Sequence, residues 1–145
     1  MAESLKDRIR SDLNQARRDR DKLRTMVLTT TLSEIRNREI EVGHELSDDE
    51  VVAVISGSVK RRREAAEQMR AGGREDLAEK EEFEATILTD YMPPALSEAE
   101  VREMVREAIA EGATSIGAVM GRLAPRIKGR FDGREANRIV REELG

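Results

Sequence analysis

Apolar residues recur every three to four positions along most of the chain, and this periodicity limits the possible fold more than any other feature. Such spacing places apolar side chains on one face of an α-helix. Leu5, Ile9 and Leu13 form one such stripe near the start, and Val101 and Val105 belong to another. Nowhere do β-branched residues alternate with polar ones for long enough to indicate a strand. The sequence therefore predicts an all-α protein with about seven helices.

Capping residues mark where several of these helices begin. Ser47 with Glu50 and Ser97 with Glu100 have the spacing of a capping box, in which each residue binds a free N–H group of the first turn. Residues 17–24 alternate in charge and contain almost no core positions. This run is either a kink between two helices or a solvated turn of one long helix.

Two consecutive prolines divide the chain. Pro93 and Pro94 cannot donate a backbone N–H group, so they end the preceding helix. We expect a helical N-terminal domain over residues 1–93 and a small three-helix domain over residues 97–145.

The composition excludes several kinds of catalytic site. The chain has no cysteine and one histidine, His44, which lies in an expected loop. These residues cannot assemble a catalytic triad or an ordinary transition-metal site. The spacing of Gly117, Gly121 and Arg122 does not match a phosphate-binding loop. We therefore expect a non-catalytic protein with no metal and no cofactor.

The sequence also bears on location. No stretch approaches the roughly 20 apolar residues that a membrane span requires. The charged start of the chain is not followed by an apolar run, so no signal peptide is expected. We expect a cytoplasmic protein that does not contact membranes.

Positive charge is concentrated near the C-terminus of a chain whose net charge is −4. The basic residues between positions 121 and 141 are Arg122, Arg126, Lys128, Arg130, Arg134, Arg138 and Arg141. Only Asp132 and Glu135 oppose them there. Arg134, Arg138 and Arg141 have the spacing of one helix face. Such a surface attracts polyphosphate, although an ordinary solvated face is the alternative.

This basic segment is predicted to connect two helices. We expect the first helix to end at Pro125 and Gly129 to form a tight turn. Asp132 is placed to cap the second helix, and Glu135 stands at the capping-box position.

Two other charged regions are interpreted as solvated helix faces. In the basic run at residues 60–63, Glu64 and Glu67 are placed to pair with Lys60 and Arg63 one turn away. The carboxylates between residues 79 and 84 are dense, and we expect them to face solvent.

A series of motifs in order resembles the GatB/YqeY family. The motifs are Ala71-Gly72 with Arg74, Asp76-Leu77-Ala78, Glu81, Tyr91, Pro93, Leu96-Ser97, Pro125, Lys128-Gly129-Arg130, Asp132-Gly133, Asn137 and Val140. The family includes small standalone YqeY-like proteins and the tail of the B subunit of glutamine-dependent tRNA amidotransferase. Phe131 departs from the pattern, because the family usually has a small residue at this position within the proposed contact loop.

The resemblance implies a non-catalytic, tRNA-binding accessory module with an amidotransferase-tail-like second domain. The implied nucleic-acid-binding residues are Arg126, Lys128, Arg130, Arg134, Asn137 and Arg138. Because the chain has only three aromatic residues, contact would be to phosphates and shape rather than by base stacking. A label of carbon–nitrogen ligase with glutamine as amido-N-donor would be inherited from the shared tail.

A second hypothesis treats the chain as a helical protein–protein adaptor. Its binding surface would be the acidic middle, residues 75–90, and its partner a protein of translation. The sequence leaves the identity of the tRNA or partner and the oligomeric state open.

Overall fold

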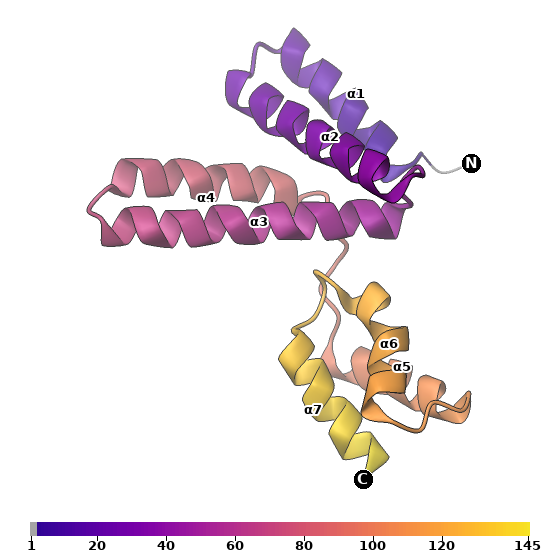
Figure 1. Ribbon diagram of the computed structural model, residues 1–145. Coiled ribbons are helices and arrows are strands. Elements are labelled where there is room, and N and C mark those ends of the chain that lie inside the picture. Colours follow the sequence, from indigo (N-terminus) through magenta and orange to yellow (C-terminus); the bar gives the residue numbers. More distant parts are fainter. Residues whose placement is uncertain (1–2) are drawn as a thin grey trace. The chain divides into compact units, whose positions relative to one another are not determined.

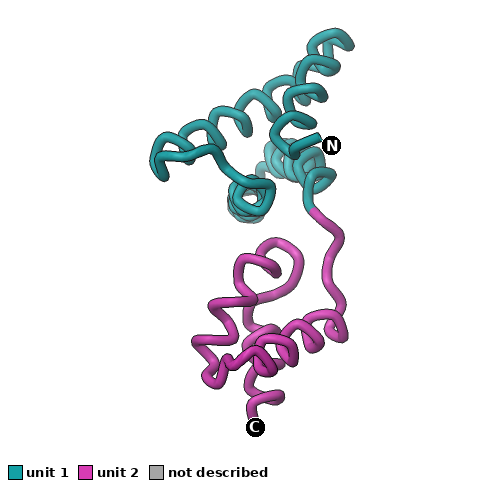
Figure 2. The backbone as a smooth tube through the Cα atoms, turned by 90° about the vertical axis from the view of Figure 1, so that its right-hand side faces the viewer, with its two compact units in different colours: residues 1–92 teal, residues 93–145 magenta. Residues whose placement is uncertain are grey.

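The computed structural model describes residues 3–145, which form α-helices joined by short connections (Figure 1). The helices are α1 (Leu5–Arg18), α2 (Lys22–Val42), α3 (Asp48–Ala71), α4 (Glu75–Thr89), α5 (Glu98–Ala110), α6 (Ile116–Ile127) and α7 (Gly133–Leu144). The described part of the chain contains no strand, so the prediction of an all-α protein with about seven helices is confirmed. The chain divides into two compact units, Met1–Met92 and Pro93–Gly145 (Figure 2).

The alternating charges after α1 correspond to a break between two helices. Arg20 adopts a φ of 57°, which is uncommon outside glycine and reverses the chain direction. The side chain of Asp21 then accepts the backbone N–H of Arg24 at 3.0 Å and caps α2. The sequence allowed either a kink between two helices or a solvated turn of one long helix, and the structure has the kink.

Unit 1 is built from two helical hairpins, α1 with α2 and α3 with α4, whose members run side by side (Figure 1). Its apolar core consists of Ile9, Leu13, Val27, Leu28, Ile35, Leu46, Val51, Ile55, Val59, Ala85, Ile87, Leu88 and Tyr91. The Tyr91 hydroxyl donates a hydrogen bond to Asp12 at 2.6 Å, which ties the end of the unit to α1. Burial, together with this bond, raises the pKa of Tyr91 above its usual value.

An ion pair lies inside the α3–α4 hairpin, where the sequence predicted a solvated face. Glu84 of α4 is 3% exposed and accepts a hydrogen bond from the Arg62 guanidinium of α3. The expectation of solvent exposure was therefore wrong for Glu84, because the hairpin turns this position toward α3. Glu64 and Glu67, which were expected to pair within α3, form no ion pair with any residue between 3 and 145.

Unit 2 is a three-helix domain in which α5, α6 and α7 contact each other in every pairing. Its core consists of Val101, Met104, Val105, Ala108, Ala113, Val119, Leu123, Ile127, Ala136, Ile139 and Val140. The prediction that α6 ends at Pro125 was two residues short, because the helix continues to Ile127. A proline removes one N–H group, but the bond from Lys128 N–H to the Ala124 carbonyl at 3.1 Å still closes the last turn.

Among the described residues, no helix is both long enough and apolar enough to cross a membrane.

Candidate nucleic-acid interface

The connection between α6 and α7 is a tight turn. Gly129 has a φ of 75°, as its predicted role in the turn requires. The N–H of Arg130 donates to the Ile127 carbonyl at 2.8 Å. Asp132 then accepts the N–H of Arg134 at 2.8 Å and caps α7, as the sequence predicted. The backbone of this turn is therefore held by local hydrogen bonds.

Further bonds fix the turn to the segment that precedes α5. The Arg130 carbonyl accepts the N–H of Leu96 at 2.8 Å, and Arg130 Nε donates to the Pro94 carbonyl at 3.2 Å. Phe131 is half-buried and packs against the core of unit 2. The aromatic ring that departs from the family pattern thus anchors the turn from inside.

Three of the proposed contact residues have exposed side chains close together in sequence around this turn. Arg126 and Lys128 stand at the end of α6, and Arg134 stands in the first turn of α7. Within residues 3–145, none of the three forms an ion pair with a carboxylate. Arg130 is half-buried but bonds a neutral carbonyl, so its positive charge is not offset. Asn137 is half-buried on α7.

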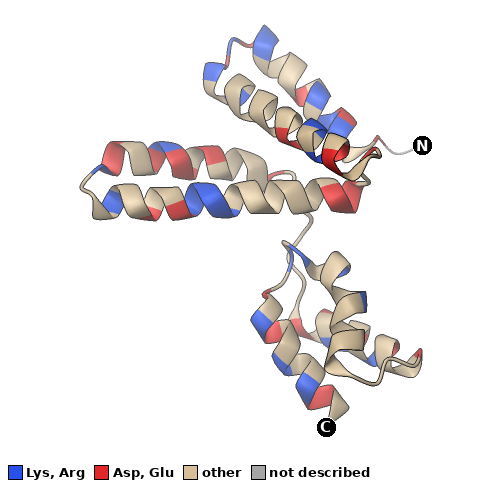
Figure 3. Cartoon of the chain, viewed as in Figure 1, with Lys and Arg blue, Asp and Glu red and all other residues tan. Residues whose placement is uncertain are grey.

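We call Arg126, Lys128, Arg130 and Arg134 the basic loop. Figure 3 shows these positive charges along the connection between α6 and α7 and at the start of α7. Arg141 is also exposed, but it lies seven residues after Arg134, about 10 Å along the helix.

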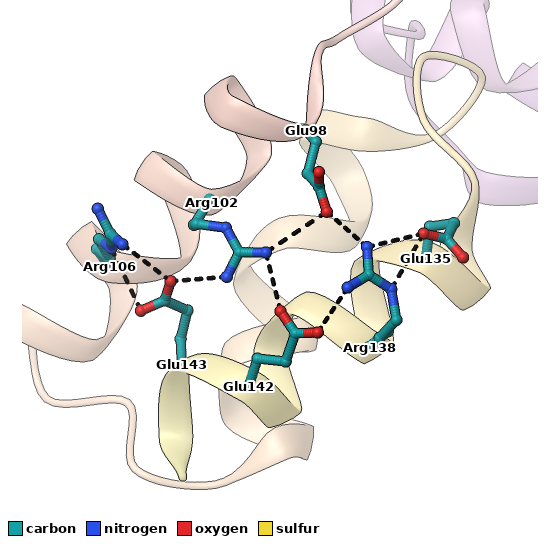
Figure 4. Close-up of polar contacts among 7 residues, drawn as sticks. All are labelled: Glu98, Arg102, Arg106, Glu135, Arg138, Glu142 and Glu143. Atoms are coloured by element: carbon teal, nitrogen blue, oxygen red, sulfur yellow. Dashed lines mark hydrogen bonds and ion pairs between the residues drawn. The ribbon is translucent and has the colours of Figure 1, made fainter.

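Arg138 has a different environment from the basic loop. Its guanidinium bonds Glu98 at 2.5 Å, Glu142 at 2.6 Å and Glu135 at 3.0 Å (Figure 4). These carboxylates, with Glu98 first, raise the pKa of Arg138 above its already high value. Because three carboxylates bind it, the exposed Arg138 side chain is fixed in an ion-pair network and most of its charge is offset.

The ion pairs of Arg138 belong to a network that joins α5 to α7. Arg102 of α5 reaches Glu142 and Glu143 of α7, each at 2.9 Å, and Arg106 lies 3.2 Å from Glu143 (Figure 4). Sequence reasoning missed this network, although the four-residue spacing of Arg138 and Glu142 was visible. Glu98 with Arg102 and Glu135 with Arg138 are also one turn apart. The links between α5 and α7 join residues about 40 positions apart, which helical spacing does not reveal.

Glu135 also differs from its predicted capping role. It pairs with Arg138 one turn later in α7, and Asp132 alone caps the helix. At the other end of the basic segment, Arg122 pairs with Glu111 at 3.1 Å. Of the basic residues between positions 121 and 141, Arg122 and Arg138 are therefore neutralised locally.

The acidic middle of the chain is also largely paired. Arg70 binds Glu75 and Glu82, each at 2.7 Å. Arg74 lies 3.2 Å from Asp76. These arginines reduce the negative surface charge that the adaptor hypothesis requires.

In the part of the chain that the structure describes, no group of three or more His, Cys, Asp or Glu residues could hold a metal ion. The lone histidine, His44, is exposed, with its Nε2 atom 3.9 Å from Glu50.

Comparison with known proteins shows which family this chain resembles. The model of the family described as Yqey-like protein matches residues 6–144. Altered inheritance of mitochondria protein 41, mitochondrial, from Pyrenophora tritici-repentis is 31% identical over 144 residues, which cover 95% of this chain and 80% of the relative. The protein of the same name from Lachancea thermotolerans is 31% identical over 106 residues, covering 71% of this chain and 57% of the relative.

An uncharacterized protein of Schizosaccharomyces pombe is 34% identical over 85 residues, which cover 59% of this chain and 69% of the relative. The family model spans all seven helices, and this agrees with the order of motifs seen in the sequence. This chain therefore belongs to the YqeY-like protein family.

Proposed function

We propose that this protein is a non-catalytic accessory module that binds tRNA through the basic loop of unit 2. The observation that carries the proposal is the contrast between the basic loop and three other arginines of its domain. Arg138, Arg102 and Arg122 are bound by carboxylates, whereas the basic loop has no carboxylate partner among the described residues.

Phosphate groups are the ligand that this arrangement suits. Each phosphate neutralised by a cation releases condensed counterions from the nucleic acid, which supplies favourable free energy at low salt. The hydrogen bonds of Arg130 to Pro94 and Leu96 hold the turn before any ligand arrives. A preformed loop loses less conformational entropy on binding than a flexible one.

The expected mode of contact is to the backbone and shape of the RNA. Phe131, the aromatic residue of the turn, is half-buried against the core of unit 2, so most of its ring is taken up by packing rather than free to stack on a base. Arginine and lysine contacts to phosphate position a nucleic acid without reading its sequence. The choice of tRNA over other RNAs rests on the resemblance of this segment to the amidotransferase tail.

The proposal assigns no ligase activity to this chain. It places the protein in the cytoplasm on sequence grounds, whereas two of its relatives are named as mitochondrial proteins. Because tRNA occurs in both compartments, the proposed ligand is compatible with either location.

The test is the binding of fluorescently labelled bulk tRNA, measured by anisotropy at about 50 and 200 mM salt. The variant reverses Arg126, Lys128 and Arg134 to glutamate, and leaves Arg130 in place because its side chain holds the turn. If the basic loop contacts four phosphates, the wild-type affinity falls roughly 50- to 150-fold between the two salt concentrations. The variant should lose this binding.

A matched control reverses three other exposed cations, Lys60, Arg63 and Lys80, which form no ion pairs within residues 3–145. The control makes the same change in net charge in unit 1 and should bind tRNA almost as the wild type does. If both variants lost the same tRNA affinity, the loss would come from the change in net charge and not from the basic loop. An absence of wild-type binding at the lower salt would overturn the proposal.

A further inference from the structure

The helices α1 and α2 of unit 1 run side by side (Figure 1). Side chains from both helices line a groove. It encloses a cavity of about 420 Å³. Arg10 and Arg17 line it from α1, and Arg36 lines it from α2 together with the hydroxyl residues Thr29 and Ser33. Arg10 and Arg17 are seven residues apart, so they lie on one face of α1 about 10 Å apart along the helix.

The carboxylate in this groove is already compensated. Glu39 accepts a hydrogen bond from the buried Lys6 ammonium at 2.8 Å and another from the Leu46 N–H at 2.9 Å. The Lys6 bond is the main reason why the pKa of Glu39 lies below its usual value. Lys6 is also bound by Glu45 at 2.9 Å. Glu39 therefore does not cancel the charge of the arginines in the groove.

The three arginines keep most of their charge available. Arg17 and Arg36 are exposed and form no ion pair within residues 3–145. Arg10 lies 3.6 Å from Asp7, and both side chains are more than half exposed. An exposed pair of this kind is weak and is screened by salt. The groove therefore carries a local excess of about three positive charges.

A second cavity of about 420 Å³ lies near the turn between the two helices. Arg17 lines both cavities, and Arg20 and Lys22 line the second one. Two acidic residues also lie in this turn, where Asp19 accepts a bond from Gln15 and Asp21 caps α2. Both keep their negative charge and offset part of the charge of Arg20 and Lys22. Basic residues therefore line both cavities.

We infer that the α1–α2 groove binds an extended phosphate-bearing chain through its phosphate groups. Grooves of this kind follow a polyanion backbone by electrostatic attraction. The hydroxyls of Thr29 and Ser33 supply neutral hydrogen-bond donors beside the arginines. No aromatic residue lines either cavity, so the groove should not select among bases. The site goes beyond the proposed function because it lies in unit 1 and uses none of the basic loop.

The test is a titration of the ¹⁵N-labelled full chain followed by amide chemical shifts, which locate each site separately. The probes are sodium tripolyphosphate and a single-stranded oligouridylate. We expect shifts at the amides of Arg10, Arg17, Ser33 and Arg36 with both probes. For three phosphate contacts, the affinity for the oligouridylate should fall roughly 20-fold between about 50 and 200 mM salt.

The variant replaces Arg17 and Arg36 by glutamate, and both side chains are exposed and unpaired among the described residues. We expect it to lose about tenfold or more in affinity at the groove. The control, Lys60→Glu with Arg63→Glu, makes the same charge change on α3 and should leave the groove shifts unaltered. Equal loss in the control would overturn the inference.

A third variant separates this site from the basic loop. With Arg126, Lys128 and Arg134 reversed, the groove shifts should persist even though binding at unit 2 is lost. If the amide shifts of the wild type were confined to unit 2, the inference about the groove would be wrong, and the proposed function would be unaffected. Shifts in the groove with the oligouridylate alone would assign the ligand to nucleic acid, and shifts with both probes would show that phosphate groups suffice.

Discussion

Arg138 of α7 and Glu98 of α5 are joined by a hydrogen bond of 2.5 Å between Nη2 and Oε1. The two residues are 40 positions apart in the sequence, and their contact links the first and last helices of unit 2. A residue that the sequence placed among the nucleic-acid contacts is therefore part of the framework of its domain. The available positive charge is concentrated in the turn that precedes it.

Replacement of Arg138 by lysine separates these two roles. Lysine keeps the positive charge but lacks the planar fork that reaches three carboxylates at once. We expect the thermal unfolding midpoint to fall and the tRNA affinity at fixed salt to change by no more than about twofold. Circular dichroism melts and anisotropy titrations measure the two quantities. A loss of affinity with an unchanged midpoint would instead place Arg138 at the interface.

The same network should make stability depend on pH. The pKa values of Glu98, Glu142 and Glu143 lie below their usual 4.5, mainly because Arg138 bonds the first and Arg102 the other two. A carboxyl with a lowered pKa in the folded state stabilises the fold above its unfolded pKa. That stabilisation is lost as the pH falls through the folded pKa.

We therefore expect the melting midpoint to change little between about pH 7 and pH 5 and then to fall steeply toward about pH 3. In the Arg138→Lys variant, the melting midpoint should fall less steeply with pH, because the bonds that lower the carboxyl pKa values are partly lost. A variant with the same acid profile as the wild type would show that other carboxyls govern the transition.

Local features of the sequence predicted the helices and several of their ends. Ser47 and Glu50 form the expected capping box, with both reciprocal hydrogen bonds present. Asp132 and Gly129 also take their predicted places. These features depend on residues within one helical turn of each other, so the local sequence is sufficient to predict them.

The long-range partners of charged residues could not be found in this way. Periodicity assigns a side chain to a helix face, but it does not say which other helix covers that face. Glu84 was therefore expected in solvent and is buried against Arg62, 22 residues earlier. Arg138 likewise had the spacing of a basic face, and its partner Glu98 comes from a helix distant in sequence.

The buried pair of Glu84 and Arg62 leads to a prediction about unit 1. Glu84→Ala leaves the Arg62 guanidinium largely buried with only Glu81, 3.9 Å away, as a partner. Removal of one member of a buried pair typically costs about 3–5 kcal/mol of stability. Urea unfolding should show this loss, whereas Glu79→Ala on the exposed part of α4 should cost less than about 0.5 kcal/mol.

A double replacement tests whether the pair is needed for stability at all. In the described structure, Arg62 Nε is buried without a hydrogen-bond partner, so the pair is not fully satisfied. Replacing both residues, as Arg62→Met with Glu84→Leu, should therefore cost less than Glu84→Ala alone. A double variant less stable than the single one would show that the pair contributes net stability.

Gly129 offers a test that connects the turn to binding. Its φ of 75° is strained for any residue with a Cβ atom, so Gly129→Ala should destabilise the chain by about 1–2 kcal/mol. The turn carries Lys128 and Arg130 on either side, so a shift in its backbone should also weaken tRNA binding. Urea unfolding and anisotropy on the same preparation measure both effects.

The matched control is Gly121→Ala in the middle of α6. A Cβ atom at this position meets nothing within 4 Å, and alanine favours a helix over glycine by roughly 0.5–1 kcal/mol. The control should therefore be more stable than the wild type and bind tRNA equally well. If Gly129→Ala lost stability but kept full affinity, the geometry of the turn would not matter for binding, because flexible cations alone would then account for the contact.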